Sequence, residues 1–139
     1  MRRFLFLVAL AVSHEMIYAD LPDWVTPEMT DMVKDDKIRC MNEHGTDEEM
    51  IVRANDGDLV DDRKLKCYMY CLMESFGLVD TDGEFEMELL IGFLPENLQD
   101  VARNAMNACA DEGGDDPCEK VYMHSLCIYK RNPQLWFLI

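Results

Sequence analysis

Residues 65–76 read LKCYMYCLMESF, and this stretch decides the fold. Its apolar residues recur every three to four positions, which is the pattern of one face of an amphipathic helix. Cys67 and Cys71 lie one turn apart on that helix, so their side chains leave the same face. Intervals of 26, 3, 37, 8 and 8 residues separate six cysteines along the chain: Cys40, Cys67, Cys71, Cys109, Cys118 and Cys127.

Six cysteines allow about 15 disulfide pairings, and helix geometry reduces that number. Cys118 and Cys127 lie on one expected helix, on opposite sides and roughly 13 Å apart along its axis, so they cannot bond each other. Cys67 and Cys71 point alongside each other rather than toward each other, so a bond between them is not expected. About ten pairings stay open. Three disulfides would each stabilise a small domain by roughly 2–4 kcal/mol.

Helix start and stop signals divide the chain into about six helices with short connections. Thr26 is expected to cap a helix that ends at Gly45, and Thr46-Asp47-Glu48-Glu49 is interpreted as a capping box that opens the next helix. No stretch alternates with a period of two residues. The expected fold class is therefore all-α, with later helices over about residues 84–91, 98–109 and 118–129.

The first 19 residues have the pattern of a secretory signal peptide. Arg2 and Arg3 precede an apolar run over residues 4–12, which is too short to span a membrane, and cleavage is expected after Ala19. Residues 20–139 then form one domain. No later segment predicts membrane insertion. We expect the protein to be secreted, by an oxidising route that permits disulfides.

The charge balance excludes one class of partner, and the motifs disfavour enzymes. Asp and Glu outnumber Lys and Arg by 28 to 13, so no basic surface for nucleic acid is expected. A Gly-x-Ser-x-Gly elbow is absent from the sequence. If all six cysteines are paired, no thiol remains as a nucleophile. The chain is therefore predicted not to be an enzyme, and no catalytic residue is assigned.

The motif Asp80-x-Asp82-Gly83 is similar to part of a calcium-binding loop, but its spacing argues against calcium binding. In an EF-hand loop Gly83 would be the sixth position, so the first and twelfth would be Leu78 and Leu89. Neither side chain can bind a cation. No metal and no cofactor are therefore expected.

The cysteine spacing resembles that of the insect odorant-binding proteins, the PBP/GOBP family. Three stretches are similar to the honeybee-type antennal pheromone-binding subgroup: residues 36–46, 67–72 and 92–95. The resemblance implies about six helices around an apolar cavity, and the disulfides Cys40–Cys71, Cys67–Cys118 and Cys109–Cys127. It also implies carriage of a small hydrophobic odorant or pheromone through sensillar lymph toward an olfactory receptor. A homodimer is left open.

The apolar tail Leu135–Ile139 is expected to fold back, either as ordinary core or as part of the cavity wall. Backbone N–H groups near Leu138 and Ile139 could then donate to a ligand oxygen. The methionines on the helices suit an adaptable pocket, although such a stripe is also common in plain cores. Face position and the resemblance together give nine candidate ligand-binding residues: Trp24, Val33, Met69, Leu72, Phe76, Leu94, Phe137, Leu138 and Ile139.

Three features bear on pH dependence. Asn55 stands where the subgroup leads us to expect an acidic residue, which puts an acid-sensitive switch there in doubt. His44 and His124 are expected to be surface or capping histidines; the alternative is a pH sensor that includes the acidic residues Asp111, Glu112, Asp115 and Asp116.

Two other functions remain open from the sequence. A secreted helical protein-interaction or signalling module would place the apolar tail at an interface with a partner. A carrier of lipophilic molecules outside olfaction would use the same cavity as an odorant carrier. The sequence does not determine the ligand, because apolar pockets discriminate weakly between similar chains.

Overall fold

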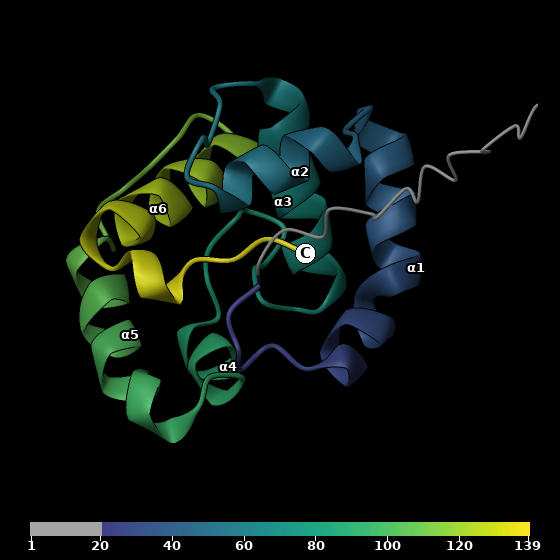
Figure 1. The fold of residues 1–139 in the computed structure, drawn as a ribbon. Helices are drawn as coiled ribbons and strands as arrows, with labels where there is room; N and C mark the ends of the chain where they lie inside the picture. Colours follow the sequence, from purple (N-terminus) through teal and green to yellow (C-terminus); the bar gives the residue numbers. More distant parts are fainter. Residues whose placement is uncertain (1–20) are drawn as a thin grey trace, which may run out of the picture.

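The computed structural model describes residues 21–139, so the signal peptide expected over residues 1–19 lies outside the described part. Figure 1 shows helices arranged around the segment that carries the C-terminus. Within this part, no helix is both long enough and apolar enough to cross a membrane. The elements in chain order are α1 (Pro27–His44), α2 (Glu48–Asn55), α3 (Arg63–Ser75), α4 (Met87–Gly92), α5 (Glu96–Ala108), α6 (Pro117–Arg131) and the 3₁₀ helix η1 (Pro133–Leu135).

The all-α expectation is confirmed, and the helix ends follow local chemistry. The Thr26 hydroxyl accepts a hydrogen bond from the Met29 N–H at 3.3 Å, and Gly45, with φ of 68°, ends α1 in the left-handed conformation. The prediction of a capping box that starts at Thr46 is wrong in one residue. The N-cap of α2 is Asp47, whose side chain accepts a hydrogen bond from the Met50 N–H at 2.9 Å. Thr46 is instead buried, and its hydroxyl donates to the Lys64 carbonyl on α3.

The start of α4 also differs from the sequence expectation. The helix begins at Met87 rather than near residue 84. Val79 and Phe85 form an isolated antiparallel bridge, and the Glu86 N–H donates to the Leu78 carbonyl at 2.9 Å. These backbone bonds hold residues 78–86 in a turn, so the chain enters the helix about one turn later.

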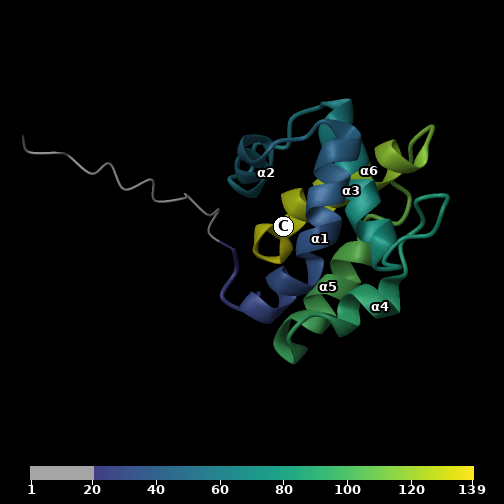
Figure 2. The same cartoon turned by 90° about the vertical axis from the view of Figure 1, so that its right-hand side faces the viewer.

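Helix α3 lies at the centre and packs against α1 on one side and α6 on the other (Figures 1 and 2). Leu65, Tyr68 and Met69 on α3 are fully buried. Burying large apolar side chains stabilises a fold by roughly 1.5–3 kcal/mol each. The LKCYMYCLMESF stretch therefore supplies the core residues on which the other helices pack.

Three disulfides fix this arrangement. Cys40–Cys71 joins α1 to α3, Cys67–Cys118 joins α3 to α6, and Cys109–Cys127 joins the end of α5 to α6. This is the set that the resemblance implies. The two cysteines of α6 reach different helices from opposite sides, as the geometry of a nine-residue separation requires.

Candidate functional site

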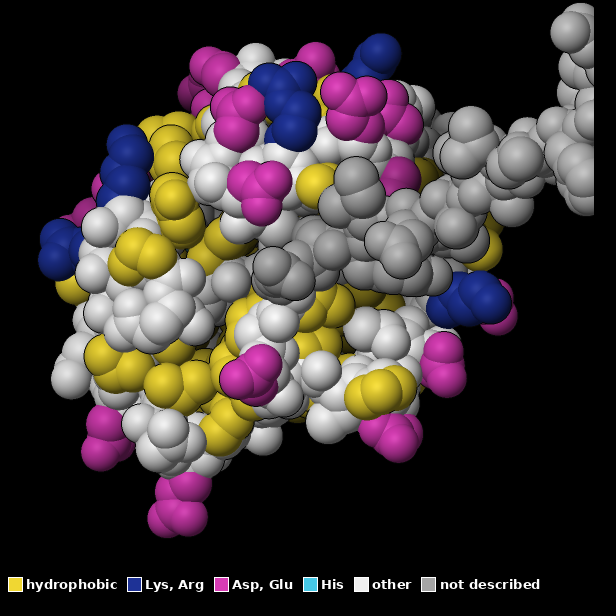
Figure 3. All heavy atoms as spheres, viewed as in Figure 1, with side chains coloured by type: hydrophobic (Ala, Val, Ile, Leu, Met, Phe, Trp, Pro, Cys, Tyr) yellow, Lys and Arg dark blue, Asp and Glu magenta, His cyan; other side chains and the backbone are white. Residues whose placement is uncertain are grey.

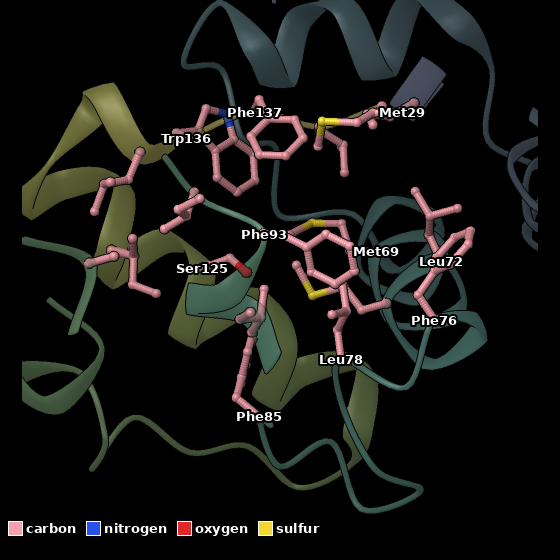
Figure 4. Close-up of a pocket in the computed structure, with 18 of the residues that line it drawn as sticks. Met29, Met69, Leu72, Phe76, Leu78, Phe85, Phe93, Ser125, Trp136 and Phe137 are labelled. Carbon is pink, nitrogen blue, oxygen red and sulfur yellow. The ribbon is translucent and has the colours of Figure 1, made fainter. Parts of the chain in front are cut away.

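An apolar cavity of about 200 Å³ lies between α1, α3, α4, α5, α6 and the apolar tail, Leu135–Ile139. Figure 4 shows labelled side chains of α1, α3, α6 and the tail around it, together with those of Leu78, Phe85 and Phe93. A dry apolar cavity of roughly 150 Å³ is large enough to bind benzene. The cavity is lined by Trp24, Met29, Met32, Val33, Met69, Leu72, Met73, Phe76, Leu78, Phe85, Leu90, Phe93, Leu94, Ala102, Met106, Ser125, Ile128, Leu135, Trp136, Phe137, Leu138 and Ile139.

The tail forms one wall of the cavity and is held there by side chains of α2 and α3. The Asn55 amide donates to the Leu138 carbonyl at 2.6 Å, and the Asn55 carbonyl oxygen accepts from the Leu138 N–H at 2.7 Å. The Trp136 indole N–H donates to the Ala54 carbonyl at 2.8 Å. The backbone N–H and carbonyl of Leu138 are thus both satisfied within the chain.

Tyr68 anchors the last residue of the tail. Its hydroxyl donates to a main-chain oxygen of Ile139. Burial, and to a lesser extent the nearby Glu48, raises the pKa of Tyr68 well above its ordinary value, so the phenol remains protonated and able to donate.

The segment before α1 meets the tail across the cavity. Trp24 and Phe137 pack edge to face, with ring centroids 4.8 Å apart and planes at 89°, which is a favourable aromatic geometry. This contact joins the two ends of the described chain and covers the cavity on that side.

The cavity opens to solvent where α1 approaches α4. Met32 and Phe93 both line the cavity, yet they are 58% and 46% exposed. Figure 3 shows hydrophobic side chains near the centre of the face seen in Figure 1, with acidic side chains around them. We refer to the opening between Met32 and Phe93 as the mouth.

Comparison with known proteins identifies the architecture. The family model described as "PBP/GOBP family" matches residues 23–131, which include all six cysteines. The chain belongs to the PBP/GOBP family. General odorant-binding protein 69a of Drosophila melanogaster is 27% identical over 127 residues, which cover 91% of this chain and 86% of that protein.

Solved structures have the same fold. Odorant binding protein 5 of Apis mellifera superposes with a TM-score of 0.70 at 23% identity, covering 81% of this chain and 95% of that one. Odorant binding protein 7 of Anopheles gambiae, solved in complex with an azo compound, superposes with a TM-score of 0.70 at 21% identity, covering 83% and 99%. The family and the fold together support a role as a carrier of small ligands. The narrower likeness to the honeybee pheromone-binding subgroup stays a prediction.

The structure places the nine sequence-predicted residues of this PBP/GOBP protein around one cavity. They come from the segment before α1, from α1, α3, the α4–α5 connection and the tail. Several further lining residues could have been found from helical spacing: Met29 lies four positions before Val33, and Met73 lies four after Met69. Phe85 and Leu78 could not, because the backbone bridge that turns them inward is not visible in the sequence.

The tail's role in ligand contact differs from the expectation in one respect. The Leu138 N–H is already committed to Asn55, so it is not available to a ligand oxygen. The residue that sequence reasoning missed is Ser125, the only serine, threonine, asparagine or glutamine among the lining residues that the structure describes. Its signal was a small polar residue on the apolar stripe of α6, four positions after Val121.

The two histidines of the described chain, His44 and His124, differ in how deeply they are buried. His44 is half-buried in the last turn of α1, where a helix end favours a positive charge, as expected. The expectation for His124 is wrong, because this residue is buried and its ring packs on Phe85 with centroids 4.2 Å apart. Its Nε2 has no hydrogen-bond partner within residues 21–139. Burial lowers the pKa of His124, against a weaker opposing effect of Glu112 and Glu84.

Proposed function

We propose that this protein is a secreted carrier that binds small hydrophobic odorants or pheromones in its internal cavity. The observation that carries the proposal is a cavity whose wall, within residues 21–139, is apolar except for one serine, and which is closed on one side by a tail that the chain's own hydrogen bonds hold in place. An apolar cavity with few polar groups is the usual form of a small-molecule site. The azo compound bound by the Anopheles gambiae relative is consistent with such a ligand.

The proposed ligand contacts are the nine residues predicted from the sequence, which lie on several sides of the cavity. Met69 and Leu72 contribute the wall on α3, Val33 and Trp24 the side near α1, and Phe137 the wall on the tail. Methionine side chains among the lining residues can change rotamer to accommodate ligands of different shape. We therefore expect a permissive site rather than one that selects a single compound.

Transport through sensillar lymph to an olfactory receptor is the finer part of the proposal. Its support is indirect: the signal-peptide pattern of residues 1–19, three disulfides suited to an oxidising compartment, and relatives named as odorant-binding proteins. A lipophile carrier outside olfaction would use the same cavity. A competition screen across esters, alcohols, terpenoids and fatty acids, combined with localisation of the protein in tissue, separates these two roles.

A protein-interaction module is the weaker alternative. Such a module would present the apolar tail to a partner, but Leu138 is only 5% exposed, and its backbone N–H and carbonyl are both bonded to Asn55. An enzyme is weaker still, since carriers rather than enzymes are named among the relatives. We therefore assign no catalytic residue.

The proposal is tested by filling the cavity. Met73 lines it, whereas Met123 is a similarly half-buried methionine on α6 that does not. Met73→Trp should lower the affinity for a fluorescent apolar probe at least tenfold. The matched variant Met123→Trp should bind the probe with the affinity of the wild type. Equal binding by the two variants would argue against the cavity as the ligand site.

A further inference from the structure

We infer that the cavity selects a neutral ligand that carries one hydrogen-bonding oxygen, and that the Ser125 hydroxyl binds this oxygen. The inference deepens the proposed carrier function and rests on it. It names the chemical class of ligand: an alcohol, aldehyde, ketone or ester on an otherwise apolar skeleton, rather than an ionised acid.

Ser125 lies on α6 and is only 3% exposed, although it lines the cavity. Figure 4 shows its oxygen turned toward the interior, in the space between Trp136 and Phe85. A serine inside a helix usually bonds back to a carbonyl of the preceding turn. Ser75 on α3 does so, donating to the Cys71 carbonyl at 2.7 Å, but no residue in the described range 21–139 accepts from Ser125.

Among the described lining residues, the Trp136 indole and the Leu138 backbone are already paired. The Trp136 indole N–H donates to Ala54, and the Leu138 N–H and carbonyl are both bonded to Asn55. The main-chain oxygen of Ile139 accepts from Tyr68. Ser125 is therefore the side chain on this wall that is buried, polar and free to bind a ligand.

The charge of the wall sets the second part of the inference. The described residues that line the cavity include no Lys, Arg, His, Asp or Glu. An ionised carboxylate would lose its hydration there without meeting an opposite charge, which disfavours it strongly. A neutral oxygen loses one hydrogen bond to water and regains one from Ser125, so its transfer into the cavity is close to balanced.

The position of Ser125 also sets the ligand's orientation. The serine belongs to the deep wall, whereas Met32 and Phe93 form the exposed mouth. A ligand whose oxygen meets Ser125 directs its apolar end toward Met32 and Phe93. Longer chains can then extend into the mouth without displacing the anchored oxygen.

The first arm of the test uses variants of matched shape. Thr and Val have the same branched shape, but only Thr keeps a hydroxyl, so Ser125→Thr and Ser125→Val differ in hydrogen bonding and not in volume. We expect Ser125→Val to bind decanol about three- to tenfold more weakly than Ser125→Thr, the effect of one net hydrogen bond. Butylbenzene, which has no oxygen, should bind both variants within about twofold. Equal decanol affinity in the two variants would overturn the assignment of Ser125.

The second arm needs no variant and stands even if a substitution impairs folding. At neutral pH the wild type should bind methyl decanoate at least tenfold more tightly than decanoate, which has the same chain but an ionised end. Tighter binding of decanoate would overturn the selection for neutral ligands. Failure of butylbenzene, decanol and methyl decanoate alike to bind the wild type would instead refute the carrier function, so the two failures are distinguishable.

Discussion

Asn55 on α2 and Leu138 in the tail exchange two hydrogen bonds, one in each direction, across 83 positions of sequence. The amide donates to the Leu138 carbonyl and accepts from the Leu138 N–H, which only a side chain with both a donor and an acceptor can do. Neither bond involves a group that titrates near neutral pH. This contact therefore holds the cavity wall in a manner that does not depend on pH.

Replacing Asn55 with Asp should make ligand binding pH-dependent. An ionised carboxylate still accepts from the Leu138 N–H, but it cannot donate and it lies against the Leu138 carbonyl, which raises its pKa. Binding of Asn55→Asp at neutral pH should be about two- to tenfold weaker than that of the wild type. It should improve as acid protonates the carboxyl and restores the donor.

Fluorescent displacement at several pH values between neutrality and the carboxyl range measures this effect. Asn55→Ala is the control, since it loses both bonds and gains no titrating group, so its affinity relative to the wild type should not vary with pH. Parallel pH profiles for Asn55→Asp and Asn55→Ala would contradict the role of the amide.

Deleting residues 135–139 should weaken ligand binding at least several-fold while the helical fold survives. The deletion removes one wall of the cavity, but it leaves all three disulfides and the packing of α1, α3 and α6. Circular dichroism reports the helices, and displacement reports binding. Unchanged affinity in the truncated chain would show that the tail is ordinary core packing.

The disulfides should differ in their contribution to stability. Cys67–Cys118 closes a sequence separation of 51 residues, and Cys109–Cys127 one of 18. If restriction of the unfolded chain dominates, replacing both cysteines of the first bond with Ala should cost about 1 kcal/mol more than the same change in the second. Denaturant unfolding measures both losses. A larger loss from the shorter loop would point to native packing as the dominant effect.

Buried His124 should make the protein less stable in acid. Its pKa in the folded state lies below the ordinary value near 6.5, because burial disfavours the charged ring, while Glu112 and Glu84 oppose the shift only weakly. The unfolded chain therefore binds the proton more readily. The stability contribution is present above about pH 6.5 and is lost as the pH falls through the folded-state pKa.

His124→Phe should reduce this acid dependence, because a phenyl ring can keep the packing against Phe85 and does not titrate. The measurement is the free energy of unfolding at intervals between about pH 5 and 7.5, compared between the wild type and the variant. His44→Gln is the control at a half-buried helix end. An equal slope of stability against pH in the wild type and in His124→Phe would contradict the account of the buried ring.

The sequence predicts the helices well, because their signals are local. Thr26 and Gly45 act within one turn of the residues they cap, and the periodicity of residues 65–76 is complete within that segment. The cap of α2 and the start of α4 were missed for the opposite reason. Thr46 bonds to Lys64 on another helix, and residues 79–86 are held by backbone bonds outside any helix.

In the candidate site too, features set by local sequence are predictable and features set by distant contacts are not. Apolar residues such as Val33 and Leu72 can be chosen from the face of the helix on which they lie, and both line the cavity. Whether an apolar face surrounds a space or fills it depends on how several helices meet, which helical spacing does not encode. The sequence does not predict the burial of His124, because the burial of a polar residue depends on neighbours far away in the sequence. Ser125 falls on the apolar stripe of the last helix, but this position alone does not show that it lines a cavity.

Native mass spectrometry of the wild-type chain with methyl decanoate tests the central claim most directly. The claim is that one internal cavity takes up one small neutral hydrophobic molecule. We predict a single adduct of one ligand per chain that saturates with concentration and is displaced by decanol. The absence of an adduct, or a series of adducts that grows without saturation, would contradict a defined cavity as the binding site.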